Sequence, residues 1–512
     1  MLGFIKNRSQ NTKMEVIMPN QILSKSQYLT GLQCPKALWL LKNSSHLKKD
    51  PSITQQLLFD EGREVEKVAR ELFPEGVEVK HGEKNLKNQI METQELINSG
   101  VETIYEGAFE YDNIIIKADL LQKGEGGWNL YEIKSSSEIS NIQKDDIALQ
   151  YYVLKESNLI SISSASLIHI NKQYIREGKI KVSELFTTVD MTEFVIQEQE
   201  EIQNKLILMR NILNREIPQV EISFDRCDIP YECEFKNYCW AHIPPVSVFN
   251  LSRLTKANKF KLYTQGIVNL KDLPKDYKLS AFQKAQVEAE LSGNDVVDNN
   301  SLSRFLSEET HYPLYFLDFE TFYTVIPRFN GISPRQKIPF QYSLHLMNHE
   351  NSDLKHEEFL GEEGIDPRQN LAKKLIKDVG EEGSILTYSG FEKGVVKALA
   401  RDFPEYSVQL MKIHDRLVDL MAPFQKGYIY KQSMQGSYSI KKVLQAFYSG
   451  HSDLDYKKLN ISDGLQASAE YANLYKKNNA DKAKTKDDLL RYCRLDTKAM
   501  VLVFKKIQEM AG

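Results

Sequence analysis

This sequence of 512 residues has few of the features that mark membrane-bound, secreted or strongly charged proteins. No apolar run approaches the roughly 20 residues of a membrane helix, and the first residues lack the apolar centre of a signal peptide. The formal net charge is only −4, so any phosphate-binding surface must be local. We therefore expect a cytoplasmic protein of two or three domains with no membrane association.

Cysteine is also scarce, with five residues in the whole chain. Cys34 stands far ahead of Cys227, Cys233 and Cys239, which form a C-x5-C-x5-C pattern in a polar, turn-rich segment, and Cys493 stands apart. In a reducing compartment a cysteine cluster more often binds metal than forms disulfides. One remote and three close cysteines therefore predict an iron–sulfur cluster or a structural zinc ion.

The stretch 130–134, LYEIK, places a carboxylate and an ammonium on one strand face, because Glu132 and Lys134 are two residues apart. Upstream, the apolar run IIIKADLL carries Asp119, and the glycines within 124–127 predict a hairpin turn between the two runs. Two carboxylates can hold a magnesium or manganese ion that activates water, while a lysine stabilises charge on a phosphate. This pattern predicts phosphodiester hydrolysis; the simpler interpretation is an exposed hairpin with surface charges.

The N-terminal half resembles the RecB-type nucleases of the PD-(D/E)XK class that carry an iron–sulfur cluster, including CRISPR-associated members. The resemblance covers about residues 20–245 and rests on LSKSQYLTGLQCPKALWL, ADLL, YEIKSSS and the cysteine triplet. It implies a restriction-endonuclease-like α/β domain with a four-iron four-sulfur cluster on Cys34, Cys227, Cys233 and Cys239. It also implies a catalytic site made of Asp119, Glu132, Lys134 and Gln150.

Two positions depart from that family. Where many members have a metal-binding histidine, this chain has Glu66, whose carboxylate can substitute as a metal ligand. The family's Q-x-x-x-Y helix is matched by Gln150, but the tyrosines here are Tyr151 and Tyr152. The isolated His169 is expected to be a core or edge residue.

The segment 246–310 predicts a small helical linker domain. Short helices around Gly266 resemble helix-hairpin-helix segments, in which backbone amides at the turn meet a phosphate. Residues 253–284 contain eight Lys or Arg against two Asp, which is a local positive patch or simply a solvated face.

A second carboxylate pattern begins with the buried strand LYFLDFETF, which places Asp318 and Glu320 on one face. Paired carboxylates on an apolar strand repel each other unless a cation neutralises them, so they predict a metal site. Farther on, Glu392 stands at the start of a helix. In the last helix Tyr492 and Asp496 are four residues apart and hence on one face.

Residues 311–512 resemble the DnaQ-like 3′-to-5′ exonucleases of the DEDD group with tyrosine, which have a ribonuclease-H-like fold. The resemblance implies that Asp318, Glu320 and Asp496 bind two divalent metals and that Tyr492 positions the attacking water. The family usually has aspartate in its second motif, where this chain has Glu392. Glu392 is therefore the first candidate for the fourth ligand, with Asp419 or Asp415 as alternatives.

These patterns predict an α/β protein with a leader at 1–20, an iron–sulfur nuclease domain at 21–245, the linker at 246–310 and a DnaQ-like domain at 311–512. The layout also resembles a bacterial family of this architecture. The leading hypothesis is a Mg²⁺- or Mn²⁺-dependent nuclease with two active sites, acting on single-stranded or end-processed nucleic acid. DNA is favoured over RNA as the substrate. One alternative has activity only in the DnaQ-like site, on RNA, with an iron–sulfur scaffold. Another is a non-catalytic nucleic-acid-binding adaptor.

Overall fold

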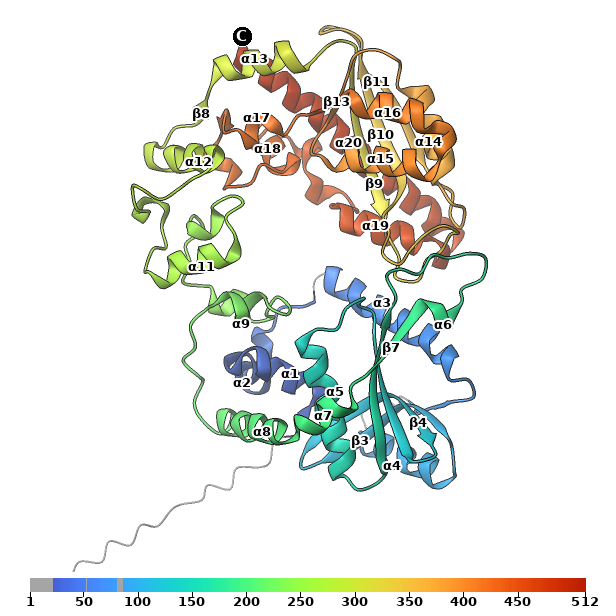
Figure 1. Cartoon of the computed structure of the whole chain (residues 1–512). Helices are drawn as coiled ribbons and strands as arrows, with labels where there is room; N and C mark the ends of the chain where they lie inside the picture. The colour runs from blue at the N-terminus through green and yellow to red at the C-terminus, as the bar shows by residue number, and fades with distance from the viewer. Residues whose placement is uncertain (1–21, 52, 81–85) are drawn as a thin grey trace, which may run out of the picture. The chain divides into compact units, whose positions relative to one another are not determined.

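The computed structural model describes residues 22–51, 53–80 and 86–512, which form a mixed α/β fold. The predicted leader at 1–20 lies outside the described residues. The chain divides into two compact units, each with its own sheet (Figure 1). Unit 1 takes its residues from Met1–Lys49, Ala69–His169 and Thr187–Lys236, and unit 2 from Asp50–Val68, Ile170–Phe186 and Asn237–Gly512.

The sheet of unit 1 has seven strands in the order β2-β3-β4-β5-β6-β7, with β1 beside β4. β3, β4 and β5 are antiparallel neighbours, and β6 continues the sheet parallel to β5. The strands are β1 (Leu23–Ser24), β2 (Val77–Glu78), β3 (Thr103–Tyr111), β4 (Ile114–Gly124), β5 (Gly127–Lys134), β6 (Ile162–Ile170) and β7 (Phe186–Asp190).

The predicted hairpin is formed by β4 and β5, which pair from Gly124 opposite Gly127. Gly127 has a φ of +136°, and a side chain there would stand 2.5 Å from the carbonyl oxygen of Ser161, so the turn requires glycine. The pairing ends at Leu120 opposite Tyr131, and beyond it Asp119 Oδ2 accepts from the Ile133 amide at 2.8 Å, next to Glu132.

Apolar helices pack against this sheet and share one core with it. The helical segment after β7 is divided at Glu198 into α7 and α8. The helices of unit 1 are α1 (Lys25–Gln33), α2 (Pro35–Asn43), α4 (Leu86–Asn98), α5 (Asn141–Glu156), α7 (Thr192–Gln197), α8 (Gln199–Leu213) and α9 (Phe224–Asp228).

The main sheet of unit 2 has the order β11-β10-β9-β12-β13. β9 is antiparallel to β10 and parallel to β12. The strands are β9 (Leu314–Phe322), β10 (Ile338–Met347), β11 (Lys355–Leu360), β12 (Ser384–Thr387) and β13 (Leu417–Asp419). A separate pair joins β8 (Val296–Val297) to β14 (Ile429–Tyr430).

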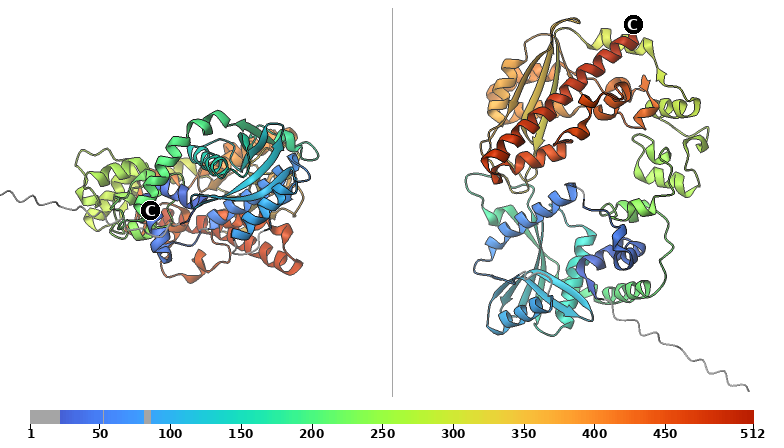
Figure 2. Two further views of the ribbon diagram at one scale, coloured as in Figure 1. Left: turned by 90° about the horizontal axis from the view of Figure 1, so that it is seen from below. Right: turned by 180° about the vertical axis from the view of Figure 1, so that it is seen from behind.

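The two faces of β9 pack against different helices because strand side chains alternate. Tyr315, Leu317 and Phe319 share a core with α14 (Arg368–Asp378), α15 (Phe391–Asp402) and α16 (Ser407–Asp415). The opposite face, which carries Asp318 and Glu320, lies under the long helix α20 (Asn479–Ala511), seen across the sheet in the right view of Figure 2. No described helix is long and apolar enough to cross a membrane.

The segment 246–310 is mainly helical. It contains η3 (Val248–Asn250), α11 (Lys256–Thr264), η4 (Leu270–Asp272), α12 (Ala281–Ser292) and α13 (Asn299–Glu309). Gly266 follows α11 with a φ of +78°, at the predicted turn. A small core holds η3, α11 and η4 together, whereas α12 and α13 pack into a core shared with β9 and α20.

Candidate metal centre and a second carboxylate site

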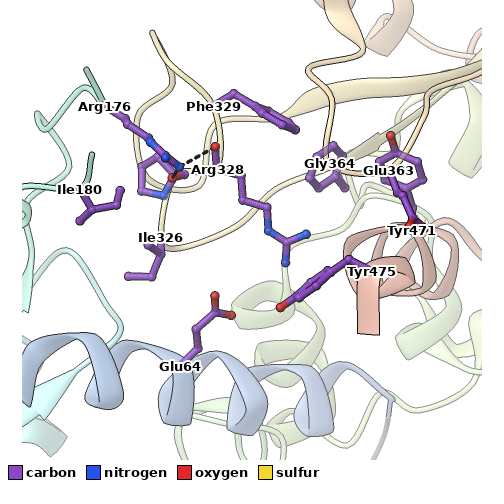
Figure 3. A pocket seen from close by; sticks show the side chains of 12 residues that line it. Glu64, Arg176, Ile180, Ile326, Arg328, Phe329, Glu363, Gly364, Tyr471 and Tyr475 are labelled. Carbon is purple, nitrogen blue, oxygen red and sulfur yellow. Dashed lines mark hydrogen bonds between the residues drawn. The ribbon is translucent and has the colours of Figure 1, made fainter. Parts of the chain in front are cut away.

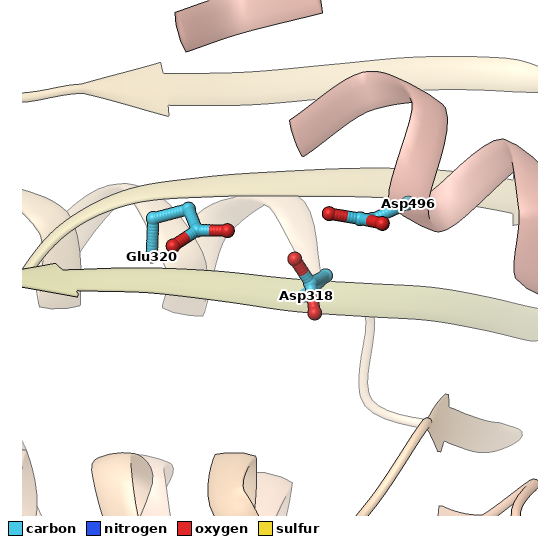
Figure 4. A group of neighbouring side chains, drawn as sticks. All are labelled: Asp318, Glu320 and Asp496. Atoms are coloured by element: carbon cyan, nitrogen blue, oxygen red, sulfur yellow. The ribbon is translucent and has the colours of Figure 1, made fainter. Parts of the chain in front are cut away.

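In unit 2 the structure brings Asp318, Glu320 and Asp496 together. One oxygen from each carboxylate lies within 4.8 Å of the other two, and among the described residues this is the only such group of three or more potential metal ligands. Asp318 and Glu320 project from β9, and Asp496 approaches them from α20 (Figure 4). Asp318 and Glu320 lie 178 and 176 positions before Asp496, yet the strand and the helix bring all three carboxylates to one point.

Two of the three carboxylates are almost fully enclosed, and Asp318 is partly buried. Glu320 is 8% exposed and Asp496 is 6% exposed. In the part of the chain that the structure describes, none of the three carboxylates forms an ion pair with lysine or arginine. Burial, followed by repulsion from neighbouring carboxylates, raises the pKa of Asp318 and of Glu320 well above the ordinary value. Burial also raises the pKa of Asp496 to about 6.

Two tyrosines surround Asp496. The Tyr456 hydroxyl donates to Asp496 Oδ1 at 2.6 Å, and Tyr492 also hydrogen bonds to Asp496, where both bonds favour the charged carboxylate. Burial followed by the charge of Asp496 raises the pKa of both tyrosines, so both stay neutral donors at physiological pH. The ammonium of Lys441 lies 4.8 Å from the Tyr456 ring centre and 4.9 Å from that of Tyr492.

Of the three candidates for a fourth ligand, Glu392 is the one whose charge acts on the acidic triad. It begins α15, is 3% exposed, and its charge contributes to the raised pKa of both Asp318 and Glu320. Burial raises its own pKa to about 7. Asp419 ends β13, where its Oδ1 accepts from the Met421 amide at 2.9 Å. Asp415 is exposed and pairs with His414 at 3.0 Å.

The triad has the donor set of a divalent metal site. Oxygen ligands suit Mg²⁺ and Mn²⁺, and a divalent ion would neutralise these three converging carboxylates, two buried and one partly buried, whose pKa values are raised. Cys493, which the sequence left apart, lies beside the triad: its thiol is 3.7 Å from Asp318 Oδ2. Burial followed by the charge of Asp318 raises the thiol pKa well above its ordinary value, so it stays protonated as a weak donor.

A pocket of about 370 Å³ lies in unit 2 past the end of β9. Its lining residues include Phe322, which is two residues after Glu320, and the aromatic side chains of Tyr471 and Tyr475. Arg328 extends over the Tyr475 ring, with its guanidinium carbon 4.8 Å from the ring centre (Figure 3). Arg176 donates to the carbonyl oxygens of Pro327 and Arg328 and so holds the loop after β9.

In unit 1 the structure brings Glu132, Lys134 and Gln150 together, but it adds two residues that the sequence did not single out. Lys134 Nζ is 2.5 Å from Glu132 Oε1 and 2.7 Å from Asp146 Oδ2. Lys25 Nζ is 2.9 Å from the same Glu132 oxygen and 3.3 Å from Asp146 Oδ1. Gln150 Nε2 donates to Glu132 Oε2 at 2.7 Å and to Asp146 Oδ1 at 3.0 Å.

Lys25 and Lys134 neutralise most of the negative charge of the carboxylate site in unit 1. Burial lowers the pKa of Lys25, but the charges of Asp146, Glu132 and Asp119 outweigh it, and the pKa lies well above the ordinary value. The same balance raises the pKa of Lys134. Asp119 accepts from the Ile133 amide at 2.8 Å. Glu66, the predicted metal ligand, lies on α3 (Ile53–Ala69), in a segment that belongs to unit 2.

The cysteines are divided in the same way. Cys34, Cys227 and Cys233 belong to unit 1, and Cys239, at the end of α10 (Lys236–Cys239), belongs to unit 2. Gln33 donates to the carbonyl oxygens of Arg226 (3.1 Å) and Tyr231 (2.7 Å), which ties the Cys34 turn to the triplet segment. No three sulfurs in the described residues lie within 4.8 Å of one another, whereas a tetrahedral zinc site would hold them about 3.8 Å apart.

Comparisons with known proteins add one match. Residues 315–439 match a family model described as a domain of unknown function (DUF2779). The matched span contains Asp318, Glu320 and Glu392 and ends before Tyr492 and Asp496. No curated protein matches the chain.

Proposed function

We propose that this protein is a divalent-metal-dependent exonuclease whose active site is the acidic triad of unit 2. The observation that carries the proposal is the convergence of Asp318, Glu320 and Asp496 without a lysine or arginine partner in the described residues. A strand order of 3-2-1-4-5 in chain numbering, with three antiparallel strands and two parallel ones, supports a ribonuclease-H-like assignment for this unit.

The chain's own residues supply positioning. When bound, divalent ions on the three carboxylates would activate water and stabilise charge on the scissile phosphate. Tyr456 and Tyr492 hold Asp496 in its charged form and in one orientation. Tyr492 is the tyrosine that the DnaQ resemblance assigns to the attacking water, and its raised pKa keeps its proton available as a hydrogen-bond donor.

The surroundings of the triad favour a single strand as substrate. Proteins bind single-stranded nucleic acids by stacking bases on aromatic side chains and by contacting phosphates with arginine or lysine. The pocket at the end of β9 contains such a pair, because the Arg328 guanidinium lies over the Tyr475 ring. Its lining residue Phe322 is two positions after Glu320 on the same strand. DNA is the first substrate to test, with RNA as the second.

The test is trimming of a 3′-labelled and a 5′-labelled strand, as DNA and as RNA, with Mg²⁺ or Mn²⁺. The parent protein should shorten the strand from its 3′ end, and Asp318→Ala should lose at least about 10³-fold in rate, since a metal ligand supplies several kcal/mol at the transition state. Asp415→Ala, on the exposed carboxylate, is the matched control and should retain activity. Equal trimming by Asp318→Ala and the parent would refute the proposal.

Cleavage through a second site at Asp119, Glu132 and Lys134 remains a prediction. A PD-(D/E)XK assignment for unit 1 is supported by the β4–β5 hairpin and by the approach of Gln150 to Glu132. The contacts made by Lys25 favour the alternative in which only the DnaQ-like site is active.

We propose in addition that Cys34, Cys227, Cys233 and Cys239 bind a four-iron four-sulfur cluster, as the RecB resemblance implies. A cluster of four irons separates its sulfur ligands more widely than one zinc ion does. Anaerobically purified protein should be brown and contain about four irons per chain, and Cys34→Ala should lose both. One zinc and no iron would contradict the cluster.

A further inference from the structure

Lys25 is held above the carboxylates of unit 1 by the start of α1. β1 lies parallel to β4, the strand that carries Asp119, and Lys25 follows β1 directly. Ser24 caps α1: its side chain accepts from the Gln27 amide at 3.3 Å, and the Gln27 side chain accepts from the Ser24 amide at 3.1 Å. This capping box fixes the first turn of the helix and therefore the direction of the Lys25 side chain.

The ammonium of Lys25 bridges two carboxylates that come from different elements. Glu132 is on β5 and Asp146 is on α5, and the side chains of both are at most 3% exposed. Lys134 bridges the same pair, and Gln150 donates to both carboxylates. Every oxygen of Glu132 and Asp146 therefore already accepts from a protein donor.

The charges and spacings of this cluster do not fit a catalytic divalent ion. Asp119, Glu132 and Asp146 carry three negative charges, and Lys25 and Lys134 carry two positive charges. An ion at its usual distance of about 2.1 Å from Glu132 Oε1 would sit close to two ammonium groups that contact the same oxygen. Within the described residues, these three carboxylates do not offer oxygens within 4.8 Å of one another, as the triad of unit 2 does.

We infer that Lys25 takes the place of a divalent ion in unit 1, so that this site binds no Mg²⁺ or Mn²⁺ while Lys25 is present. Lys25 is then the residue that distinguishes unit 1 from a metal-dependent nuclease. Its removal should leave Glu132 Oε1 with one ammonium contact, from Lys134, and Asp146 Oδ1 with Gln150 alone, and so convert the cluster into an ion site.

The experiment counts Mn²⁺ ions bound per chain, by electron paramagnetic resonance and calorimetry, in full-length protein that carries Asp318→Asn and Asp496→Asn. This background removes the triad of unit 2, so the count reports unit 1 whether or not the proposed exonuclease activity is correct. We expect no bound ion in the background protein and about one ion after Lys25→Ala is added. Adding Glu132→Gln should abolish that ion.

Lys205→Ala is the matched control. Lys205 pairs at 2.9 Å with Asp145, the neighbour of Asp146. Its replacement by alanine should leave the number of bound Mn²⁺ ions at zero. Mn²⁺ binding in the background protein that disappears with Glu132→Gln would overturn the inference, and this measurement does not require the Lys25 variant to fold. A folded Lys25→Ala variant that binds no Mn²⁺ would overturn it as well.

Discussion

Both units contain a group of buried carboxylates at a strand that runs through the middle of a sheet, but the two groups differ in what neutralises them. In unit 1, Lys25 and Lys134 contact Glu132 and Asp146 directly. In unit 2, the described carboxylates of the triad face one another with hydrogen bonds from tyrosine and no ion pair.

The comparison shows that a carboxylate pattern alone does not define a metal site. A buried carboxylate needs a cation, and a lysine from elsewhere in the chain satisfies that need as well as a metal does. Removal of a carboxylate should therefore have opposite effects in the two units. Variants at Asp146 and Asp318 test this difference, and variants at two tyrosines and at Glu392 test the surroundings of the triad.

The largest expected effect is in unit 1. Asp146→Asn removes one partner from two largely enclosed ammonium groups, and breaking such a pair costs about 3 kcal/mol of unfolding free energy. Urea unfolding measures it. Asp145→Asn, which affects a more exposed pair one residue away, should cost at most about 1 kcal/mol. Equal costs for the two variants would show that the Lys25 cluster contributes nothing special.

In unit 2, removal of a carboxylate in the absence of metal should raise the unfolding free energy rather than lower it. The folded-state pKa of Asp496 is about 6 and that of Glu392 about 7, above their ordinary values of 3.8 and 4.5. The folded protein thus binds these protons more tightly, and stability present at low pH is lost as pH rises through 6 to 7. In EDTA, Asp318→Asn should raise the unfolding free energy at pH 8 and weaken this pH dependence, because it removes one repelling charge.

Urea unfolding at pH 5 and pH 8 provides the measurement. Mn²⁺ should restore the stability of the parent protein at pH 8 but not that of Asp318→Asn. The control Asp415→Asn changes an exposed carboxylate and should leave the profile unaltered. A parent protein whose stability in EDTA is the same at both pH values would contradict the idea that the triad lacks a cation.

The two tyrosines should affect turnover rather than folding. Tyr456→Phe removes the 2.6 Å hydrogen bond to Asp496, and hydrogen bonds to charged groups contribute about 1.5–3 kcal/mol. We expect about a 10- to 100-fold lower kcat for Tyr456→Phe and a similar or larger loss for Tyr492→Phe, with little change in KM. Single-turnover trimming would measure both, and Tyr312→Phe, which changes a tyrosine that is 39% exposed, is the control. An unchanged kcat in Tyr456→Phe would limit the tyrosine role to Tyr492.

The smallest difference concerns the fourth ligand. Glu392 raises the pKa of Asp318 and Glu320, whereas Asp419 acts on Glu392. Glu392→Gln should therefore lower the rate and raise the Mn²⁺ concentration needed for half-maximal trimming. Asp419→Asn should change both much less. A larger effect of Asp419→Asn would move the fourth ligand from Glu392 to Asp419.

The sequence by itself determined the features that depend on local spacing. Period-two alternation placed Asp318 and Glu320 on one face of β9, and the glycines of 124–127 marked the hairpin that brings Asp119 beside the strand of Glu132. Helical spacing likewise put Tyr492 and Asp496 on one face of α20. The four-residue spacing of Asp146 and Gln150, within the buried stretch of α5, carried the same kind of signal.

Only the tertiary structure decided which side chains each carboxylate meets. Lys25 lies 107 residues before Glu132, and Tyr456 lies 40 residues before Asp496. No local periodicity connects such residues, because their approach depends on how α1 packs beside β4 and how the turn at η8 (Tyr456–Lys458) packs against α20. Electrostatic energy depends on distance in space, so two similar acidic patterns along the chain acquired different partners once folded.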